Sequence, residues 1–243
     1  LVTTKSGKEG KMSLNYSGTV TIENLQDYSE MMNSAEYIDW RRWSYYYLNP
    51  SKYPRGDQPT KENDYEIFLG ATDPTAWKNI EMGWAGGTWD GSRVPNTDWC
   101  DMVTQTGITH EHTLSASGGT DKMKGYASIG YLDNEGTVKG QAYTRYTTKL
   151  SLDLKPTKWF NLGLNVNGTF SEQQYGSSAS SVGQLIKGMP SNLYAASTSL
   201  FPYASPYDEN GNRIEYPGGD DKVKNVMNEW NNSQNERRMF RAI

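Results

Sequence analysis

Two closely spaced pairs of carboxylates are the first residues in the sequence whose chemistry could be catalytic. Asp98 lies three positions before Asp101, and Asp220 directly precedes Asp221. A glycosidase needs two carboxyl groups that flank one glycosidic bond. Both pairs lie in polar, loop-like stretches, where aspartates mostly form turns and face solvent. We therefore predict no catalytic residue and no enzymatic activity, and glycan hydrolysis stays an alternative that a measured activity would support.

Two histidines, His110 and His112, are spaced so that both side chains lie on one face of a strand. Such a pair could bind a metal ion, but the same face carries Ile108 and Leu114, and no third ligand is apparent. The single cysteine, Cys100, completes no familiar zinc spacing and excludes an internal disulfide framework. We predict no metal site, and we place the histidines near the outer end of the strand, at an interface with water.

Residues 208–212 superficially suggest a calcium-binding loop. Arg213 stands where that loop requires glycine, and Gly219 stands where it requires the closing glutamate. A tight turn is therefore the better interpretation. No glycine-rich phosphate-binding loop precedes a helix, so the sequence predicts no nucleotide site and no cofactor.

Aromatic residues in polar, loop-like regions are the remaining candidates for a binding site. The chain has 17 Tyr and 8 Trp but only 5 Phe, which favours rings that can lie at a water boundary or stack on sugars. The ligand-binding candidates are Trp43, Trp84, Trp89 and Trp99. For each of them, packing of the loops together or against a partner protein is the competing interpretation.

Composition narrows the class of protein. The net charge is −4 with no basic stripe, which argues against a nucleic-acid groove. The longest apolar runs are only a few residues, so the sequence predicts no transmembrane helix. The mean hydropathy of −0.80 still permits a membrane barrel, because each strand of a barrel exposes only every second residue to lipid. Any membrane role therefore falls to strands.

Strict alternation of apolar and polar residues is the strongest structural signal in the chain. It predicts six strands, which are 12–22, 108–117, 125–132, 142–154, 160–171 and a last one that starts near 236. Several of them have about 10 to 13 residues, a length suited to a tilted crossing of a hydrocarbon layer. Short turns at 118–122 and 155–159 alternate with longer connections, as in outer-membrane barrels.

The long connections carry weaker signals. In 23–106, Asn33 and Glu36 form a capping-box pattern, which predicts a helix from there to Tyr47. After the fifth strand, a short helix is predicted near 181–187, and residues 208–212 form a hairpin-like turn.

Several motifs resemble one known family. Residues 1–8 are similar to the end of the plug domain of SusC/RagA-type TonB-linked outer-membrane proteins, where the chain enters the first barrel strand. Further segments resemble the first barrel hairpins of that family, and residues 205–211 match it more weakly. These segments are 97–99, Gly107, 114–119, 126–131 and 135–136.

The resemblance implies an all-β fold of antiparallel strands from a transmembrane β-barrel, with long extracellular loops that carry short helices. Family barrels have 22 strands, so about six strands cannot close one. It further implies that residues 1–10 are the end of the plug and the junction, and that residues 11–243 are the N-terminal part of the barrel.

The function implied by the resemblance is TonB-dependent import of glycans or similar nutrients across the bacterial outer membrane, by a multi-pass protein without cofactors. The implied partners are a SusD-like surface lipoprotein, TonB (through a segment before Leu1), a glycan ligand and outer-membrane lipid, but no nucleic acid.

Alternation then assigns the two strand faces. The polar side chains expected to line the lumen are Arg145, Lys149, Asp153, Asn165 and Asn167, whereas the alternating leucines and valine would face lipid. A soluble β-sandwich that binds carbohydrate is the main alternative, because a half-buried sheet shows the same alternation.

Overall fold

The computed structural model describes residues 10–26, 30–68, 73–176, 193–219, 223–227 and 236–243. The chain divides into two compact units. The first, which we call the sheet unit, comprises Leu1–Leu25, Gln105–Gly176 and Gln234–Ile243. The second, the helical unit, comprises Gln26–Thr104 and Ser177–Ser233.

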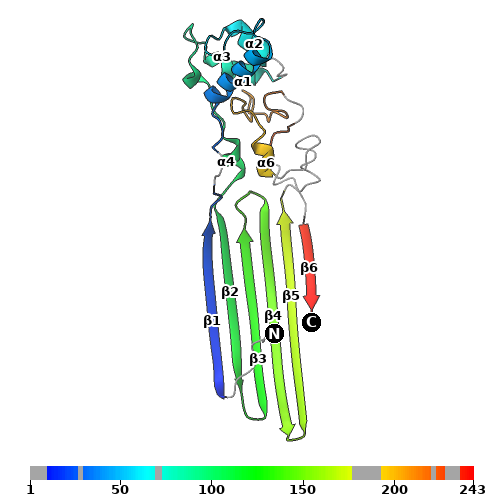
Figure 1. Ribbon diagram of the computed structural model, residues 1–243. Helices are drawn as coiled ribbons and strands as arrows, with labels where there is room; N and C mark the ends of the chain where they lie inside the picture. The colour runs from blue at the N-terminus through cyan, green and yellow to red at the C-terminus, as the bar shows by residue number, and fades with distance from the viewer. Residues whose placement is uncertain (1–9, 27–29, 69–72, 177–192, 220–222, 228–235) are drawn as a thin grey trace. The chain divides into compact units, whose positions relative to one another are not determined.

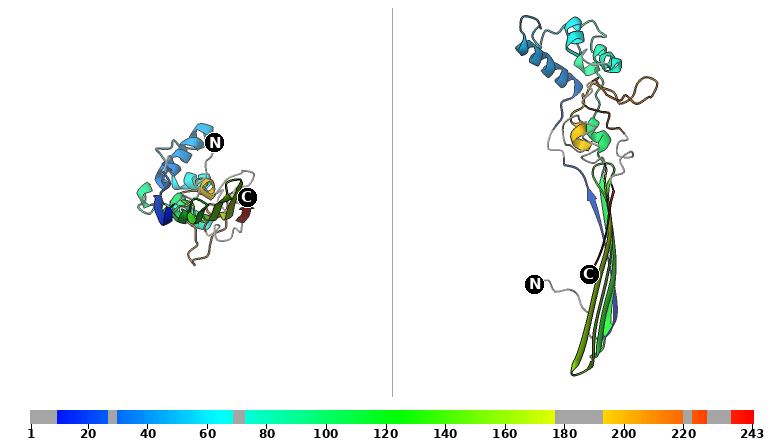
Figure 2. Two further views of the ribbon diagram at one scale, coloured as in Figure 1. Left: turned by 90° about the horizontal axis from the view of Figure 1, so that it is seen from below. Right: turned by 90° about the vertical axis from the view of Figure 1, so that its right-hand side faces the viewer.

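The sheet unit contains one antiparallel sheet whose strands follow one another in chain order (Figure 1). The strands are β1 Gly10–Glu23, β2 Gly107–Gly119, β3 Met123–Glu135, β4 Gln141–Thr157, β5 Phe160–Tyr175 and β6 Glu236–Ala242. All six predicted strands are confirmed, and the expected all-β antiparallel fold is confirmed with them. The six strands form a single open layer, as the edge-on view in Figure 2 shows.

Register keeps the alternating pattern continuous across the sheet. Leu150 of β4 lies opposite Ala127 of β3 on one side and Val166 of β5 on the other. Directly paired residues point to the same face of an antiparallel sheet, so one face collects apolar side chains and the other collects polar ones. The apolar face is open to the outside of the unit, since Leu150 is 46% exposed.

The strands extend beyond most of their predicted ends, and two of these extensions change a predicted turn. Strand β4 continues through Pro156 to Thr157, with a register shift between Leu154 and Thr157, whereas the sequence placed a break at Pro156. Proline has no N–H to donate, and an irregular step in the ladder accommodates it without ending the strand. Likewise β2 extends through Gly119, which shortens the first predicted turn.

The helical unit is built of short helices joined by turns. They are α1 Ser34–Leu48, α2 Lys61–Phe68, α3 Pro74–Met82, the 3-10 helix η1 Gly91–Arg93, α4 Trp99–Val103 and α6 Leu193–Ser197. Helix α1 confirms the predicted one, including its cap: Asn33 accepts a hydrogen bond from the N–H of Glu36, and Glu36 accepts one from the N–H of Asn33. Among the described residues, no helix is long and apolar enough to cross a membrane.

Other features of the loops divide into confirmed, missed and untested predictions. The turn at 208–212 is confirmed: Tyr207 bridges Arg213, and hydrogen bonds from the side chain and N–H of Asn212 hold the pKa of Asp208 below its ordinary value. Helix α3 was missed, although Asp73 caps it directly before a proline. The helix predicted near 181–187 lies outside the described residues.

A buried ion pair connects the helices of this unit. The guanidinium of Arg42 on α1 donates two hydrogen bonds to the carboxylate of Asp64 on α2, at 2.8 and 2.6 Å. Both side chains are almost fully buried. The indole N–H of Trp84 donates to the same carboxylate at 2.9 Å, so the buried charge of Asp64 is satisfied by three donors.

Replacing Asp64 with alanine leaves the guanidinium of Arg42 buried without its partner. We expect the helical unit to lose about 3–5 kcal/mol of stability, and limited proteolysis of the intact protein would detect the loss as faster cleavage within α1 and α2. Lys61→Ala is the matched control, because its ion pair with Glu81 is half exposed and such pairs contribute about 0–1 kcal/mol. Equal cleavage of the two variants would contradict this role of the buried pair.

Candidate functional site: a two-faced sheet and a pocket in the helical unit

The polar face of the sheet contains every side chain that the sequence assigned to a lumen. Lys149 pairs with Asn167, Asn165 pairs with Ser151, and Asp153 pairs with a glycine. Arg145 follows on the same face, four residues before Lys149. These five residues therefore share one surface of β4 and β5; that this surface lines a lumen stays a prediction.

The apolar face carries a band of rings that runs from strand to strand. Register places His112, Tyr131, Tyr146, Phe170 and Phe240 in one row across β2 to β6. The centroids of Tyr131 and Tyr146 are 5.1 Å apart, and those of Tyr146 and Phe170 are 6.3 Å apart. We call this row the aromatic row.

On β1 the aromatic row is completed by a neighbouring side chain. Gly18 occupies the row opposite His112, and a Cβ at Gly18 would lie 2.8 Å from the hydroxyl oxygen of Tyr16. The Tyr16 ring thus extends over the glycine, stacks on His112 and lies within hydrogen-bond distance of its Nδ1, at 2.7 Å. A ring therefore covers this row on β1 as well.

The next row on the same face is charged and polar. It consists of His110, Asp133, Thr144, Glu172 and Arg238. Thr144 donates a hydrogen bond to Asp133 at 2.8 Å, and Arg238 lies 3.4 Å from Glu172. The face therefore changes from hydrocarbon through rings to ions within two rows, as expected at a lipid–water interface.

A second pair of rings lies at the opposite end of the sheet. Trp159 and Phe160, at the turn between β4 and β5, have centroids 6.3 Å apart. Phe160 and Phe170 are ten residues apart on β5, which corresponds to about 33 Å along a strand. At the usual barrel tilt of about 40°, this length spans about 25 Å, the height of the apolar band of outer-membrane barrels.

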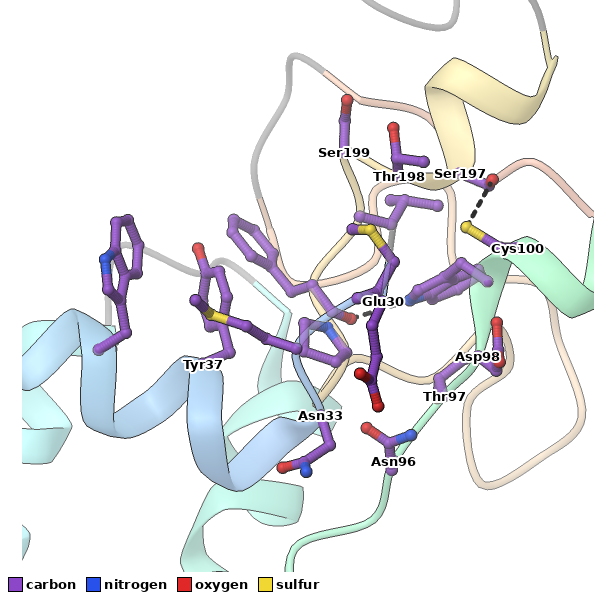
Figure 3. A pocket seen from close by; sticks show the side chains of 17 residues that line it. Glu30, Asn33, Tyr37, Asn96, Thr97, Asp98, Cys100, Ser197, Thr198 and Ser199 are labelled. Carbon is purple, nitrogen blue, oxygen red and sulfur yellow. Dashed lines mark hydrogen bonds between the residues drawn. The ribbon is translucent and has the colours of Figure 1, made fainter. Parts of the chain in front are cut away.

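The helical unit contains a separate pocket of about 430 Å³ (Figure 3). Its walls come from residues 30–40, 96–100 and 197–202. Trp40 is 52% exposed and lies 5.6 Å from the ring of Tyr37, whereas Trp99 is buried and donates its indole N–H to the carbonyl of Phe201 at 2.8 Å. The pocket thus combines an accessible aromatic ring with a fixed one.

Polar side chains at the pocket are partly fixed by local hydrogen bonds. Asn96 accepts hydrogen bonds from the N–H and the hydroxyl of Ser34, and Asp98 accepts one from the N–H of Asp101 at the start of α4. Glu30 adds a second carboxylate (Figure 3), and the described lining includes no lysine, arginine or histidine. A pocket lined by carboxylates, amides and an exposed ring can bind a hydroxyl-rich ligand.

The four tryptophans proposed as ligand contacts are not brought together. Trp99 lines the pocket. The ring of Trp43 lies against Gly56, where an added Cβ would come within 2.5 Å of it, and Trp84 donates to the buried Asp64. Trp89 packs over the guanidinium of Arg42, at 3.9 Å from its ring centroid. Ligand binding by these four residues stays a prediction, and the pocket adds Trp40, which the sequence analysis did not select.

The described residues contain no group of three or more side chains suited to hold a metal ion. The carboxylate pair Asp98 and Asp101 lies at the first turn of α4, where Asp98 is the cap. The second pair, Asp220 and Asp221, lies outside the described residues.

Comparisons with known proteins find relatives of one kind, the TonB-dependent receptors. No family model matches the sequence. The chain is 29% identical over 176 residues to TonB-dependent receptor P39 of Formosa agariphila, a match that covers 71% of the chain and 14% of the relative. It is 23% identical over 216 residues to TonB-dependent receptor SusC of Bacteroides thetaiotaomicron, covering 87% of the chain and 17% of SusC. Over most of its length the chain is thus similar to SusC/RagA-like TonB-dependent receptors.

Solved structures agree with this family. The RagAB peptide importer in its 'closed-closed' state superposes with a TM-score of 0.58 at 19% identity, covering 91% of the chain and 24% of that structure. Its 'open-open' state gives a TM-score of 0.56. At this identity the likeness shows the fold, and the open sheet is therefore the kind of sheet found in the barrel of a SusC/RagA-like receptor, a protein of the bacterial outer membrane. The chain spans less than a fifth of the length of the two curated relatives.

Two tryptophans of this chain should differ in how much stability they lose when phenylalanine replaces them. Trp84→Phe removes a hydrogen bond to a buried carboxylate, and we expect a loss of about 1.5–3 kcal/mol. Trp40→Phe alters an exposed ring and should change stability by less than about 0.5 kcal/mol. Hydrogen exchange of the α1 amides in the intact receptor measures both. A comparable loss for Trp40→Phe would show that Trp40 holds the fold and does not present a free surface.

Proposed function

We propose that the chain forms part of a TonB-dependent outer-membrane importer that carries oligosaccharides, or chemically similar nutrients, into the bacterial cell. The apolar face of the sheet carries the proposal: a band about 25 Å high, with the aromatic row at one end and Trp159 and Phe160 at the other, fits a hydrocarbon layer. In this proposal, residues 1–10 are the end of the plug and residues 11–243 begin the barrel.

Transport divides the work between the two faces and the helical unit. The apolar face contacts lipid, and the polar face lines the lumen through which the nutrient passes. The helical unit lies in the connections after β1 and β5 and meets the nutrient outside, together with a SusD-like lipoprotein. TonB then drives release of the plug, and the nutrient passes inward without a covalent change.

An oligosaccharide is the ligand that the pocket supports. Trp40 offers an exposed ring face, and Asn96, Asp98 and Glu30 offer hydrogen-bonding groups elsewhere in the lining of the same pocket. A sugar ring can stack its C–H face on the Trp40 ring and form hydrogen bonds to the carboxylates and the amide through its hydroxyl groups. The soluble β-sandwich is not favoured, because the described residues provide no second sheet to cover the apolar face.

Membrane insertion is tested by fractionating cells that carry the full-length protein. We expect it to stay in the outer membrane after high-salt and carbonate washes, and to migrate differently on a gel before and after heating. Leu164→Asp places a charge on the lipid face and should block assembly, whereas Asn165→Asp changes the lumen face of the same strand and should assemble. Equal tolerance of the two substitutions, or release of the wild-type protein into the soluble fraction, would contradict the proposal.

Ligand binding at the pocket is tested with a library of oligosaccharides on the purified full-length receptor. Trp40→Ala removes the exposed ring and should weaken binding by about 10-fold or more. Tyr47→Ala is the matched control, because Tyr47 is also an exposed aromatic residue of α1 but lies outside the pocket. Equal effects of the two substitutions would rule out the pocket as the binding site.

A further inference from the structure

The polar face of the sheet forms a groove along β5. Its floor consists of polar side chains of β5, namely Thr169, Ser171 and Gln173. Its walls consist of side chains of β4 and β6. These three strands lie side by side in the sheet (Figure 1). The groove encloses a cavity of about 330 Å³.

Three arginines line this one cavity. Arg145 comes from β4, and Arg237 and Arg241 come from β6. Lys149 follows on the same face of β4, beside Asn167. The cations therefore occupy successive rows, alternating between the two walls of the groove. We call this surface the arginine groove.

The charges of the arginine groove are incompletely compensated within the described part of the chain. Glu111 lies 3.3 Å from a terminal nitrogen of Arg145, but the Nε of Arg145 is buried and has no hydrogen-bond partner there. No carboxylate among the described residues lies within ion-pair distance of Arg237 or Arg241. Arg237 and Arg241 are themselves exposed. The buried Nε of Arg145 needs an acceptor, which a ligand, another part of the protein or water normally supplies.

The opposite face of the same strand shows a contrast. Arg238 directly follows Arg237 on β6, so its side chain points to the other face. There it forms ion pairs with Glu172 and Glu236. Among the described residues, β6 thus has one ion-paired arginine on this face and two groove arginines without an ion-pair partner.

Spacing indicates the kind of anion. Arg237 and Arg241 are four residues apart on one strand, which places them about 13 Å apart along it. One carboxylate cannot pair with both, whereas an extended chain with an anionic group on several units can. Arginine binds carboxylate and sulfate through two parallel hydrogen bonds, which suits either group.

We propose that the arginine groove binds the carboxylate or sulfate groups of an acidic oligosaccharide as it passes through the lumen. This inference rests on the proposed function, because it assumes that the polar face lines a transport path for glycans. It adds a preference for negatively charged over neutral oligosaccharides.

The test uses the full-length receptor purified in detergent and a mixture of neutral, uronate-containing and sulfated oligosaccharides of equal length. Mass spectrometry compares the retained mixture with the input. The wild-type receptor should enrich an acidic class, and the double variant Arg237→Gln/Arg241→Gln should lower that enrichment by about 10-fold, as the loss of two partly exposed ion pairs implies. The uronate and sulfate arms show which anion is bound.

Two variants control for folding and for general charge effects. Arg238→Gln removes one positive charge from β6 on the other face and should leave the enrichment unchanged. Arg237→Lys/Arg241→Lys keeps the charge but not the paired N–H donors, and it should retain part of the acidic enrichment. Heat-modifiable migration of each variant reports assembly of the barrel.

The outcomes separate this inference from the proposed function. Retention of neutral oligosaccharides without an acidic preference, or a preference unaffected by Arg237→Gln/Arg241→Gln, overturns the arginine groove but leaves glycan import standing. If the double variant loses assembly while Arg237→Lys/Arg241→Lys assembles without acidic enrichment, the arginines contact the protein itself and the inference fails. Retention of no oligosaccharide by the wild-type receptor overturns both.

Discussion

The two-residue period of the extended chain is the constraint on which the sheet depends. Each strand must present its apolar side chains to one face, and neighbouring strands must pair in a register that keeps those faces aligned. A slip of one residue in β5 would exchange Leu164 for Asn165 and bring amides to the face that carries the leucines. The paired rows from Ala127 through Leu150 to Val166 show the alignment held over three strands, and the aromatic row shows it held over five.

This same period made the sheet predictable from the sequence. Alternation needs no knowledge of partners, so all six strands and the two faces of β4 and β5 followed from residue order alone. Strand ends were harder to predict from the sequence. Pro156 indicates the end of a strand unless the register shift at this position is known. The cap of α1 was recognised because Asn33 and Glu36 contact each other locally.

The candidate site was much less accessible to sequence reasoning. Trp40, Trp84 and Trp99 are chemically equivalent in the sequence, but one is half exposed, one donates to a buried carboxylate, and one donates to a backbone carbonyl over a hundred residues away. Such differences depend on contacts between distant segments. The arginine groove is similar, since Arg145 and Arg237 are brought to one cavity only when β6 pairs with β5.

The helical unit is assembled from two insertions that are far apart in the sequence yet interlock. Thr97 donates its N–H to the carbonyl of Pro202, Trp99 donates to Phe201, and the N–H of Gly218 donates to the capping Asp73. If only one insertion were exchanged between related receptors, these donors and acceptors would lose their hydrogen-bond partners. We therefore expect recombination that diversifies this unit to replace both insertions together, although four strands of the sheet separate them in the gene.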